Sequence, residues 1–354
     1  MKRCLLLAVG FVLIVFVFSG CSLWTDGAYH SVEDHVQEDY LPNQNNREIG
    51  SFEELEQTLD YMVSHGVSND LLYVHELNTQ QLESFMTVAI QNMRRSNAIA
   101  AYAVNEITYE IGNNTGRMAI SIEITYHHTR GDILMIQDAA NMAETSLLVA
   151  QALDSCEASV VILVKNYEDT DFIQLVEDYA NNNPQSCMEM PQVSVGIYPE
   201  RGTERVVELT FTYQTSRNSL RDIQQKVQAV FDSARLYVSD DAGDWEKCAQ
   251  LYAFLMERFD YTIETSITPS YSLLHHGVGD SRAFANVYAA ICRQAGLECD
   301  VVSGTRQGQA LYWNVLKIGD IYYYIDLLDC NEKGMFIARQ QHEMSGYVWD
   351  YSQR

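Results

Sequence analysis

Hydrophobic and polar positions follow regular periods over most of the chain, and these periods predict two similar units followed by a different one. Residues 51–137 and 138–238 read alike. Each range begins with a helical spacing, continues with an apolar strand and a second helix, and ends with two alternating strands joined at a glycine. We therefore expect a duplicated helix–strand–helix–hairpin module over these two ranges.

The final strand of each unit carries the clearest internal match. ISIEITYHHTR (120–130) aligns with VELTFTYQTSR (207–217), and alternate positions are apolar in both, as in half-buried strands. The predicted elements of the first copy are a helix over 52–62, a strand over 71–77, a helix from 82 and a hairpin around Gly116. Those of the second are a helix over 136–153, a strand over 160–164, a helix from 172, a hairpin around Gly202 and a closing helix over 220–236.

Both copies also share a threonine, a tyrosine and an arginine at the end of the last strand: Thr125, Tyr126 and Arg130, and Thr212, Tyr213 and Arg217. The alternatives are a paired ligand-binding edge and a strand end followed by a helix cap, with the arginine covering neighbouring surface. We favour the structural interpretation. His127 and His128 occur in one copy only, and adjacent strand residues point to opposite faces, which argues against a shared metal site.

A different arrangement begins at residue 239. One apolar helical face is formed by Phe284, Val287, Tyr288 and Ile291. Gly296 is placed to end this helix. Strands are predicted over 297–302, 312–318 and 321–327, the last two joined by a turn at Gly319 and Asp320. The fold class is therefore α+β, with residues 239–354 as the third domain.

Several spaced motifs in this third domain resemble the transglutaminase-like superfamily, which shares papain-type chemistry. GDSRAFA (279–285) is similar to the family's G-x-C-x-x-x-A, and AGLECDVVSG (295–304) to its next block. Trp313 and Asn314 correspond to the end of H-x-W-N. Residues 322–326 correspond to W-x-x-x-D, with tyrosine replacing tryptophan, and 245–264 resembles the lead-in helix. The resemblance covers roughly residues 240–331.

The resemblance implies a cysteine–histidine–aspartate triad, of which this chain keeps one member. The nucleophile position is Ser281, the histidine position is Leu311, and the aspartate is retained as Asp326. A cysteine thiolate forms readily beside an imidazolium, whereas a serine depends on a base, and leucine is none. We therefore expect a pseudoenzyme that binds or scaffolds, with Trp313 and Asn314 beside the cleft.

Asp326 needs a new partner in such a domain, because a buried unpaired carboxylate is costly. The candidate donors are Ser281, Tyr312 and a backbone N–H. An alternative function is an active hydrolase or acyltransferase with Ser281 as nucleophile and His275 or His276 as base. These two histidines are expected in a polar turn before the helix. A third alternative is a scaffolding protein without a ligand.

The N-terminus resembles a bacterial lipoprotein signal. Lys2 and Arg3 precede an apolar run over 5–18, too short for a comfortable membrane span, and the run ends at Phe-Ser-Gly-Cys. We expect residues 1–20 to be a signal peptide and Cys21 to carry the lipid that anchors the protein to the extracytoplasmic face of the membrane. Residues 21–50 are acidic and rich in asparagine, and are expected to form a flexible linker.

The composition limits the classes of binding partner that can be expected. The formal net charge of −25 argues against nucleic acid, and a cell-wall peptide or an envelope protein is the expected ligand. No Gly-rich phosphate loop, zinc-type CxxC or HExxH is found, so neither a cofactor nor a metal is predicted.

The six cysteines after Cys21 permit disulfides outside the cytoplasm. They are Cys156, Cys187, Cys248, Cys292, Cys299 and Cys330. Their pairing is left open: Cys299 with Cys330 is one candidate, Cys156 and Cys187 share the second repeat, and Cys292 is explained as core filling.

Overall fold

The computed structural model describes residues 48–263 and 269–350, so the predicted signal peptide and Cys21 lie outside the described residues. The predicted linker, 21–50, also lies outside them, except at its end. There Glu48–Ile49 forms strand β1 and Ile49 is buried, so these two residues belong to the folded part of the chain rather than to a flexible segment. Within the described ranges, no helix is both long enough and apolar enough to cross a membrane.

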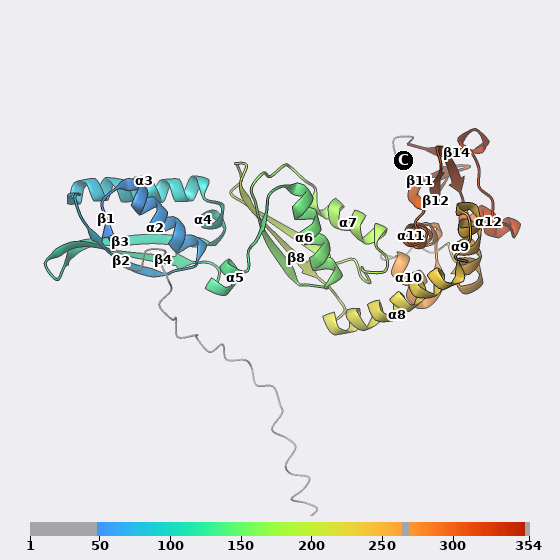
Figure 1. Cartoon of the computed structure of the whole chain (residues 1–354), viewed down its shortest axis with the longest axis horizontal. Helices are drawn as coiled ribbons and strands as arrows, with labels where there is room; N and C mark the ends of the chain where they lie inside the picture. The colour runs from blue at the N-terminus through green and yellow to red at the C-terminus, as the bar shows by residue number, and fades with distance from the viewer. Residues whose placement is uncertain (1–47, 264–268, 351–354) are drawn as a thin grey trace, which may run out of the picture. The chain divides into compact units, whose positions relative to one another are not determined.

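The first module is a four-stranded sheet with helices packed on it (Figure 1). Its elements are β1, α2 (Phe52–Ser64), β2 (Asn69–Val74), α3 (Thr79–Ser96), α4 (Ala98–Ala103), β3 (Val104–Asn114) and β4 (Arg117–Tyr126). Ser51 and Asn78 begin α2 and α3, because their side chains accept hydrogen bonds from backbone N–H groups of the first turn. The apolar faces of both helices meet alternate residues of β4, including Ile120 and Ile122, in one core.

The second module follows α5 (Arg130–Leu134). Its elements are β5 (Gln137–Ala139), α6 (Met142–Asp154), β6 (Ser159–Val164), α7 (Phe172–Asn182), β7 (Gln192–Tyr198) and β8 (Arg205–Thr212). The helix predicted over 136–153 is wrong at its start, because 137–139 forms a strand parallel to β6 and Asn141 caps α6. A three-residue strand is too short to show a period, which explains the error.

The two sheets share one topology. If the four strands of each sheet are numbered in chain order, their spatial order is 1-2-4-3 in both sheets. The strands are β1-β2-β4-β3 in the first module and β5-β6-β8-β7 in the second. The shared arginines also correspond. Arg130 Nε donates to His65 O at 3.1 Å and Arg217 Nε to Ser155 O at 3.0 Å, and each acceptor is the C-cap of its module's first helix. These contacts agree with the structural role expected for the arginines, while an origin by duplication stays a prediction.

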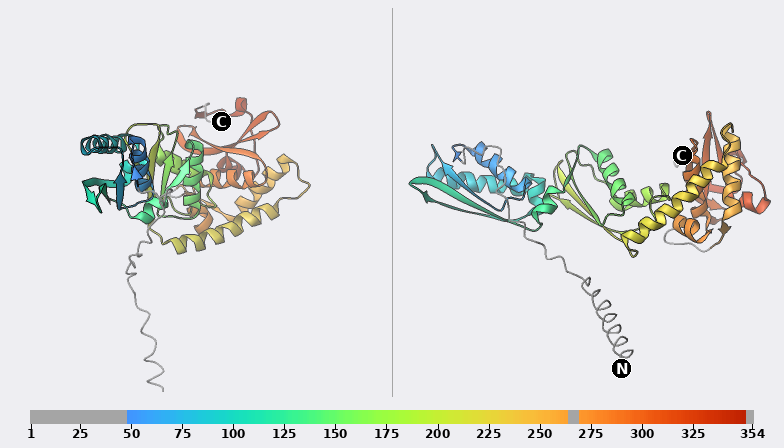
Figure 2. Two further views of the ribbon diagram at one scale, coloured as in Figure 1. Left: turned by 60° about the vertical axis from the view of Figure 1, so that its left-hand side comes forward. Right: turned by 60° about the horizontal axis from the view of Figure 1, so that its bottom comes forward.

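The C-terminal domain follows the long helix α8 (Arg217–Tyr237). Its elements are α9 (Asp244–Arg258), β9 (Asp260–Tyr261), α10 (Pro269–His276), β10 (Val278–Gly279), α11 (Ser281–Gln294), β11 (Glu298–Arg306), β12 (Gln309–Ile318), β13 (Ile321–Ile325), α12 (Leu327–Lys333), the 3-10 helix η1 (Gln341–Glu343) and β14 (Tyr347–Trp349). The main sheet has the antiparallel order β13-β12-β11-β14. Figure 2 shows that each module and this domain carry their own helices.

Helix α11 is the centre of this domain. Ten of its fourteen residues are buried, so it is enclosed more completely than the one apolar face predicted from its sequence. Gly296 follows its end with a φ of 82°, a left-handed conformation that favours glycine. The strand predicted over 321–327 is two residues too long, because Asp326 ends β13 and begins α12.

All six cysteines of the described residues are free thiols. The candidate pair of Cys299 and Cys330 is not formed: Cys330 Sγ instead accepts a hydrogen bond from Ile337 N at 3.3 Å. Cys292 is fully buried in the core of the C-terminal domain, as expected for a packing residue.

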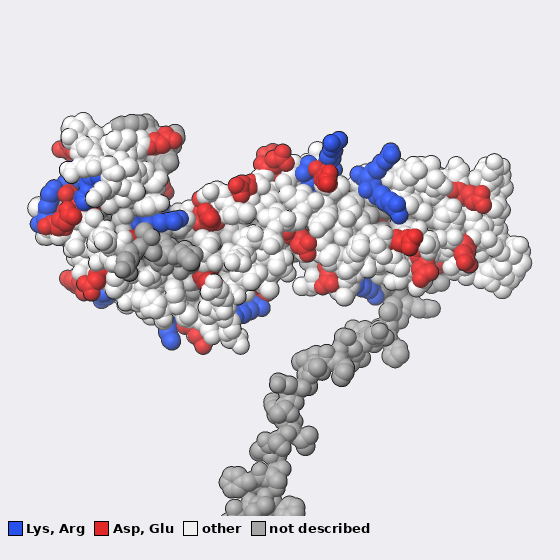
Figure 3. Space-filling model, turned by 180° about the vertical axis from the view of Figure 1, so that it is seen from behind, with Lys and Arg blue, Asp and Glu red and all other residues white. Residues whose placement is uncertain are grey.

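Charged side chains are dispersed over the one face of the molecule that Figure 3 draws. On the face shown in Figure 3, the acidic and basic residues of the described chain are scattered, and no basic patch gathers there. This face therefore offers little to a phosphate backbone, which binds clustered lysine and arginine.

Candidate functional site

Ser281, at the nucleophile position, is the first residue of α11. The helix begins there because the Asp280 side chain accepts a hydrogen bond from Ala283 N at 2.9 Å. Ser281 Oγ accepts a hydrogen bond from the backbone N–H of Tyr312 on β12, at 3.3 Å. Among the described residues, no histidine hydrogen-bonds Ser281 Oγ. The hydrogen bond of this hydroxyl is thus made with a backbone amide, whereas a serine nucleophile is activated by a neighbouring base.

Leu311, at the histidine position, belongs to the core rather than to the pocket. It is buried in an apolar cluster with Val302, Trp313 and Trp349. Its neighbour Tyr312 points to the opposite face of the strand and lines the pocket beside Ser281. The side chain that replaces the family's histidine therefore makes packing contacts only.

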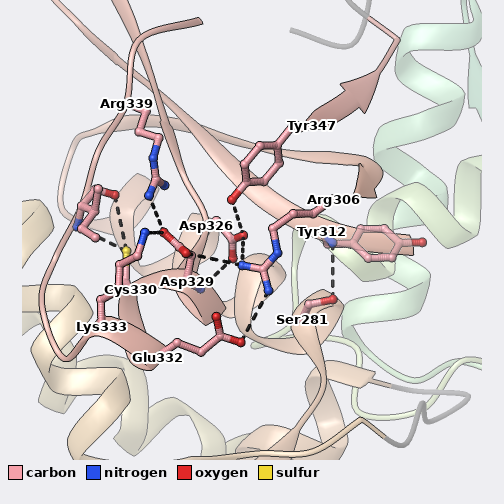
Figure 4. A network of polar contacts seen from close by, with 11 residues as sticks. Ser281, Arg306, Tyr312, Asp326, Asp329, Cys330, Glu332, Lys333, Arg339 and Tyr347 are labelled. Atoms are coloured by element: carbon pink, nitrogen blue, oxygen red, sulfur yellow. Dashed lines mark hydrogen bonds and ion pairs between the residues drawn. The ribbon is translucent and has the colours of Figure 1, made fainter. Parts of the chain in front are cut away.

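Asp326 is fully buried and accepts three hydrogen bonds. Arg306 Nη1 donates at 2.9 Å, the Tyr347 hydroxyl at 2.7 Å and the backbone N–H of Asp329 at 3.1 Å (Figure 4). The expectation of a backbone donor is confirmed. The two candidate side chains, Ser281 and Tyr312, are not donors to Asp326: the Ser281 hydroxyl and the Tyr312 backbone are bonded to each other instead.

Arg306 and Tyr347 were not anticipated from the sequence. Both lie outside the motifs that resemble the family, and Tyr347 comes from β14, which pairs with the end of β11 that carries Arg306. One signal was present. A buried aspartate without its histidine requires a cation, and Arg306 lies in the short segment that joins the strands carrying Gly304 and Leu311.

The Asp326–Arg306 pair is part of a larger, charge-balanced network. Arg306 also lies 3.5 Å from Glu332 and 3.7 Å from Asp329. Asp329 in turn pairs with Lys333 at 2.9 Å and with Arg339. The network thus joins three cations to three carboxylates, so that each buried charge has a partner of opposite sign.

The ionisation of this network is fixed by its own members. Burial lowers the pKa of Arg306, but Asp326 and Tyr347 outweigh that effect and raise it. Burial raises the pKa of Tyr347, and its hydrogen bond to Asp326 raises it further. Arg306 therefore stays charged and Tyr347 keeps its proton, so both remain hydrogen-bond donors to Asp326 and neither is available as a base.

A small pocket lies beside Ser281, with a cavity volume of about 10 Å³, which is room for about one water molecule. Its walls are largely apolar and include Met256, Tyr261, Phe284 and Leu328. Ser281 and Asn331 provide polar side chains to the lining. The pocket is therefore a small, mainly apolar depression with few positions at which a ligand can be hydrogen-bonded.

Trp313 and Asn314 do not line this pocket, which corrects the expectation that they border the cleft. Both are fully buried. Asn314 Nδ2 donates to Ala285 O at 2.8 Å and so ties β12 to α11. The Trp313 ring packs edge-to-face against Tyr347 at 5.3 Å between centroids. Their positions on the sheet serve its packing against the helix and against β14.

His275 and His276 end helix α10, so the polar turn predicted for them is wrong. The His275 ring stacks on Tyr271 at 5.1 Å between centroids and meets His276 edge-on at 4.7 Å. Tyr271 thus positions the imidazole of His275, one of the two histidines that the hydrolase alternative names as the base for Ser281. The geometry brings the two histidines together, but gives neither a hydrogen bond to the serine.

Metal-binding chemistry finds no support in the part of the chain that the structure describes. No group of three or more histidine, cysteine, aspartate or glutamate side chains is placed to hold an ion there. His128 stacks on Tyr102 at 4.0 Å between ring centroids, a packing contact.

Comparison with known proteins agrees with the motifs. Residues 232–342 match the transglutaminase-like superfamily, so the chain carries a transglutaminase-like domain and the resemblance is confirmed. No curated protein matches the chain.

Solved structures are similar at low identity. One is a crystal structure of a TGase, 10% identical with a TM-score of 0.27, covering 48% of this chain and 50% of that one. This chain thus spans half the length of that protein. A candidate cysteine protease from Cytophaga hutchinsonii is 12% identical, with a TM-score of 0.27 and coverage of 44% and 70%. A candidate protease from Parabacteroides distasonis is 8% identical, with a TM-score of 0.24 and coverage of 59% and 45%.

Proposed function

We propose that this chain is a lipid-anchored protein of the bacterial cell envelope, whose transglutaminase-like domain binds a ligand without catalysing a reaction on it. The observation that carries the proposal is the pairing of Asp326 with Arg306 and Tyr347. A catalytic aspartate orients an imidazole, and here its oxygens are occupied by two donors that accept no proton. Leu311 in the core leaves the histidine position without a base.

The test of inactivity is an assay of the full chain against a panel of esters and amides, with Ser281→Ala as the control. We expect both proteins to give the same background rate. Turnover that disappears in Ser281→Ala would instead favour the hydrolase or acyltransferase alternative, and His275→Ala and His276→Ala would then identify its base.

The apolar lining of the small pocket beside Ser281 supports surface contact with an apolar group of a peptide or an envelope protein. The test is selection of ligands by the full chain from cell-wall peptides and envelope proteins, followed by titration of the selected ligand. Leu328→Arg places a charge in the apolar wall and is expected to abolish saturable binding. Leu147→Arg, on an exposed leucine of the second module, is the matched control and should bind normally. Equal binding by both variants would place the ligand elsewhere.

Anchoring is a separate part of the proposal and rests on the Gly-Cys sequence at the end of the apolar run. Metabolic labelling with a fatty acid tests it directly. We expect label on the full chain and none on Cys21→Ser, and label on both would refute attachment at that cysteine.

A further inference from the structure

Cys156 occupies a backbone position that the other module fills with glycine. Helix α2 has its C-cap at His65 and continues with Gly66 at a φ of 62°. Helix α6 has its C-cap at Ser155 and continues with Cys156 at a φ of 50°. A positive φ brings Cβ close to the backbone, so glycine is favoured there and a cysteine is strained.

The two helix ends are closed by the same pair of hydrogen bonds. In the first module these are Gly66 N to Val63 O at 3.3 Å and Val67 N to Met62 O at 2.8 Å. In the second they are Cys156 N to Leu153 O at 3.0 Å and Glu157 N to Ala152 O at 2.9 Å. The turn is therefore the same in both modules, and it does not itself call for a side chain at residue 156.

The burial of Cys156 sets it apart from other strained residues. The described chain has three more non-glycine residues with positive φ, which are the exposed residues Glu76, Thr115 and Gln307. Cys156 is 5% exposed and contacts the core that continues into the C-terminal domain. A strained residue that is also buried indicates that its side chain has a specific use.

Cys187 lies next to this position. Gln224 Nε2 donates to Asp154 O, two residues before Cys156, at 3.0 Å and to Ser186 O, one residue before Cys187, at 2.6 Å. One side chain therefore bridges the backbone segments that lead into the two cysteines. Those two carbonyl oxygens therefore lie within about 6 Å of each other, so the chain segments that carry the two cysteines are neighbours, as a disulfide requires. Tyr213 packs against the cores to which the two cysteines belong.

We propose that Cys156 and Cys187, which are free thiols in this structure, form a structural disulfide when the chain folds in an oxidising compartment. The two thiols lose their protons and two electrons, and an incoming disulfide carrier takes up both and becomes two thiols. The strain at residue 156 is then the cost of bringing its sulfur to Cys187. This inference rests on the proposed location outside the cytoplasm, but not on the proposed lack of activity or on any ligand in the cleft.

The bond is expected to form during folding rather than afterwards. Burial, together with the neighbouring Asp154 and Cys156, raises the pKa of Cys187 to about 12. Burial also raises the pKa of the Cys156 thiol. Thiolate is the reactive form, so both thiols exchange slowly at neutral pH once the module is folded.

Peptide mapping tests the bond directly, because trypsin separates the two cysteines. Cleavage after Arg130, Lys165 and Arg201 puts Cys156 alone in peptide 131–165 and Cys187 alone in peptide 166–201. The full chain is refolded in detergent with a mixture of reduced and oxidised glutathione, alkylated and digested without reductant. We expect the two peptides to be recovered as one linked species. Recovery of both as separately alkylated peptides, or linked to other cysteines, would overturn the proposal.

Thermal unfolding gives a second test that does not depend on digestion. We expect a reductant to lower the unfolding midpoint of the oxidised wild type by about 5–10 °C, as for a disulfide that closes a loop of this length. Cys156→Gly keeps the backbone conformation but lacks the sulfur, so its midpoint should not respond to reductant, and Cys187→Ser should behave likewise. A wild-type midpoint that ignores reductant contradicts the proposal.

Discussion

Replacement of Arg306 by methionine gives the sharpest test of the site described above. Methionine keeps an unbranched chain of similar length but removes the guanidinium, which donates to Asp326 at 2.9 Å. The carboxylate of Asp326 has no exposed surface, so water cannot take the place of the lost partner. The Tyr347 hydroxyl and the Asp329 N–H remain as donors, and neither carries a positive charge.

The expected cost follows from this geometry. Removal of one partner from a buried ion pair costs about 3–5 kcal/mol, because the other charge is left uncompensated. Two of three hydrogen bonds survive, so we expect Arg306→Met to lower the free energy of unfolding by about 3 kcal/mol. The double variant Arg306→Met/Asp326→Asn removes the stranded charge as well, and should recover most of that loss.

Tryptophan fluorescence in a denaturant titration is the appropriate assay, because it reports on this domain. Of the four tryptophans, Trp245, Trp313 and Trp349 lie in the C-terminal domain, and none lies between residues 51 and 238. Lys317→Met is the matched control: its pair with Glu298 on the same sheet is exposed, so the unfolding curve should not move. A small effect of Arg306→Met, or a double variant no more stable than the single one, would refute the reasoning.

Three further perturbations test the surroundings of this pair. A Cβ at Gly304 meets the carbonyl oxygen of Val348, so Gly304→Ala should displace β14 and cost about 2 kcal/mol in the same titration. Tyr347→Phe removes one donor from buried Asp326 and should cost about 1–2 kcal/mol; an unchanged curve would mean that this bond contributes nothing. Burial raises the pKa of Asp329, but hydrogen bonds from a lysine and an arginine outweigh it and hold that pKa below its usual value. The stabilisation by Asp329 is therefore present above about pH 4 and should be lost as the pH falls through the folded-state pKa, which unfolding measured against pH would detect.

The elements that could be predicted are those in which one continuous stretch of sequence carries the whole hydrophobic period or turn signal. Helix α11 was predicted from the spacing of Phe284, Val287 and Ile291, and the hairpin of β12 and β13 from the turn at Gly319. Strands β1 and β5 were missed because two or three residues contain no period. They are defined by pairing with β2 and β6, which is information that a single stretch of sequence does not carry.

The site was harder to predict because its partners come from distant segments. The nucleophile, histidine and aspartate positions were found by motif, but the donors to Asp326 depend on strand register. Arg306 reaches it only because β11 continues beyond Val302 through the polar residues 303–306. That extension is imposed by pairing with β12 and β14 rather than by the strand propensity of the residues themselves.

The survival of Asp326 without a histidine has a structural explanation. Its side chain accepts a hydrogen bond from Asp329 N and so caps α12, a role that any catalytic use leaves unchanged. In a domain without the histidine, the carboxylate still caps α12. Its removal would therefore not stabilise the domain, as long as a cation neutralises its charge. Arg306 meets that condition, and Tyr347 supplies a third donor. A retained triad aspartate is thus weak support for catalysis in such domains, and the identity of its donors is the better guide.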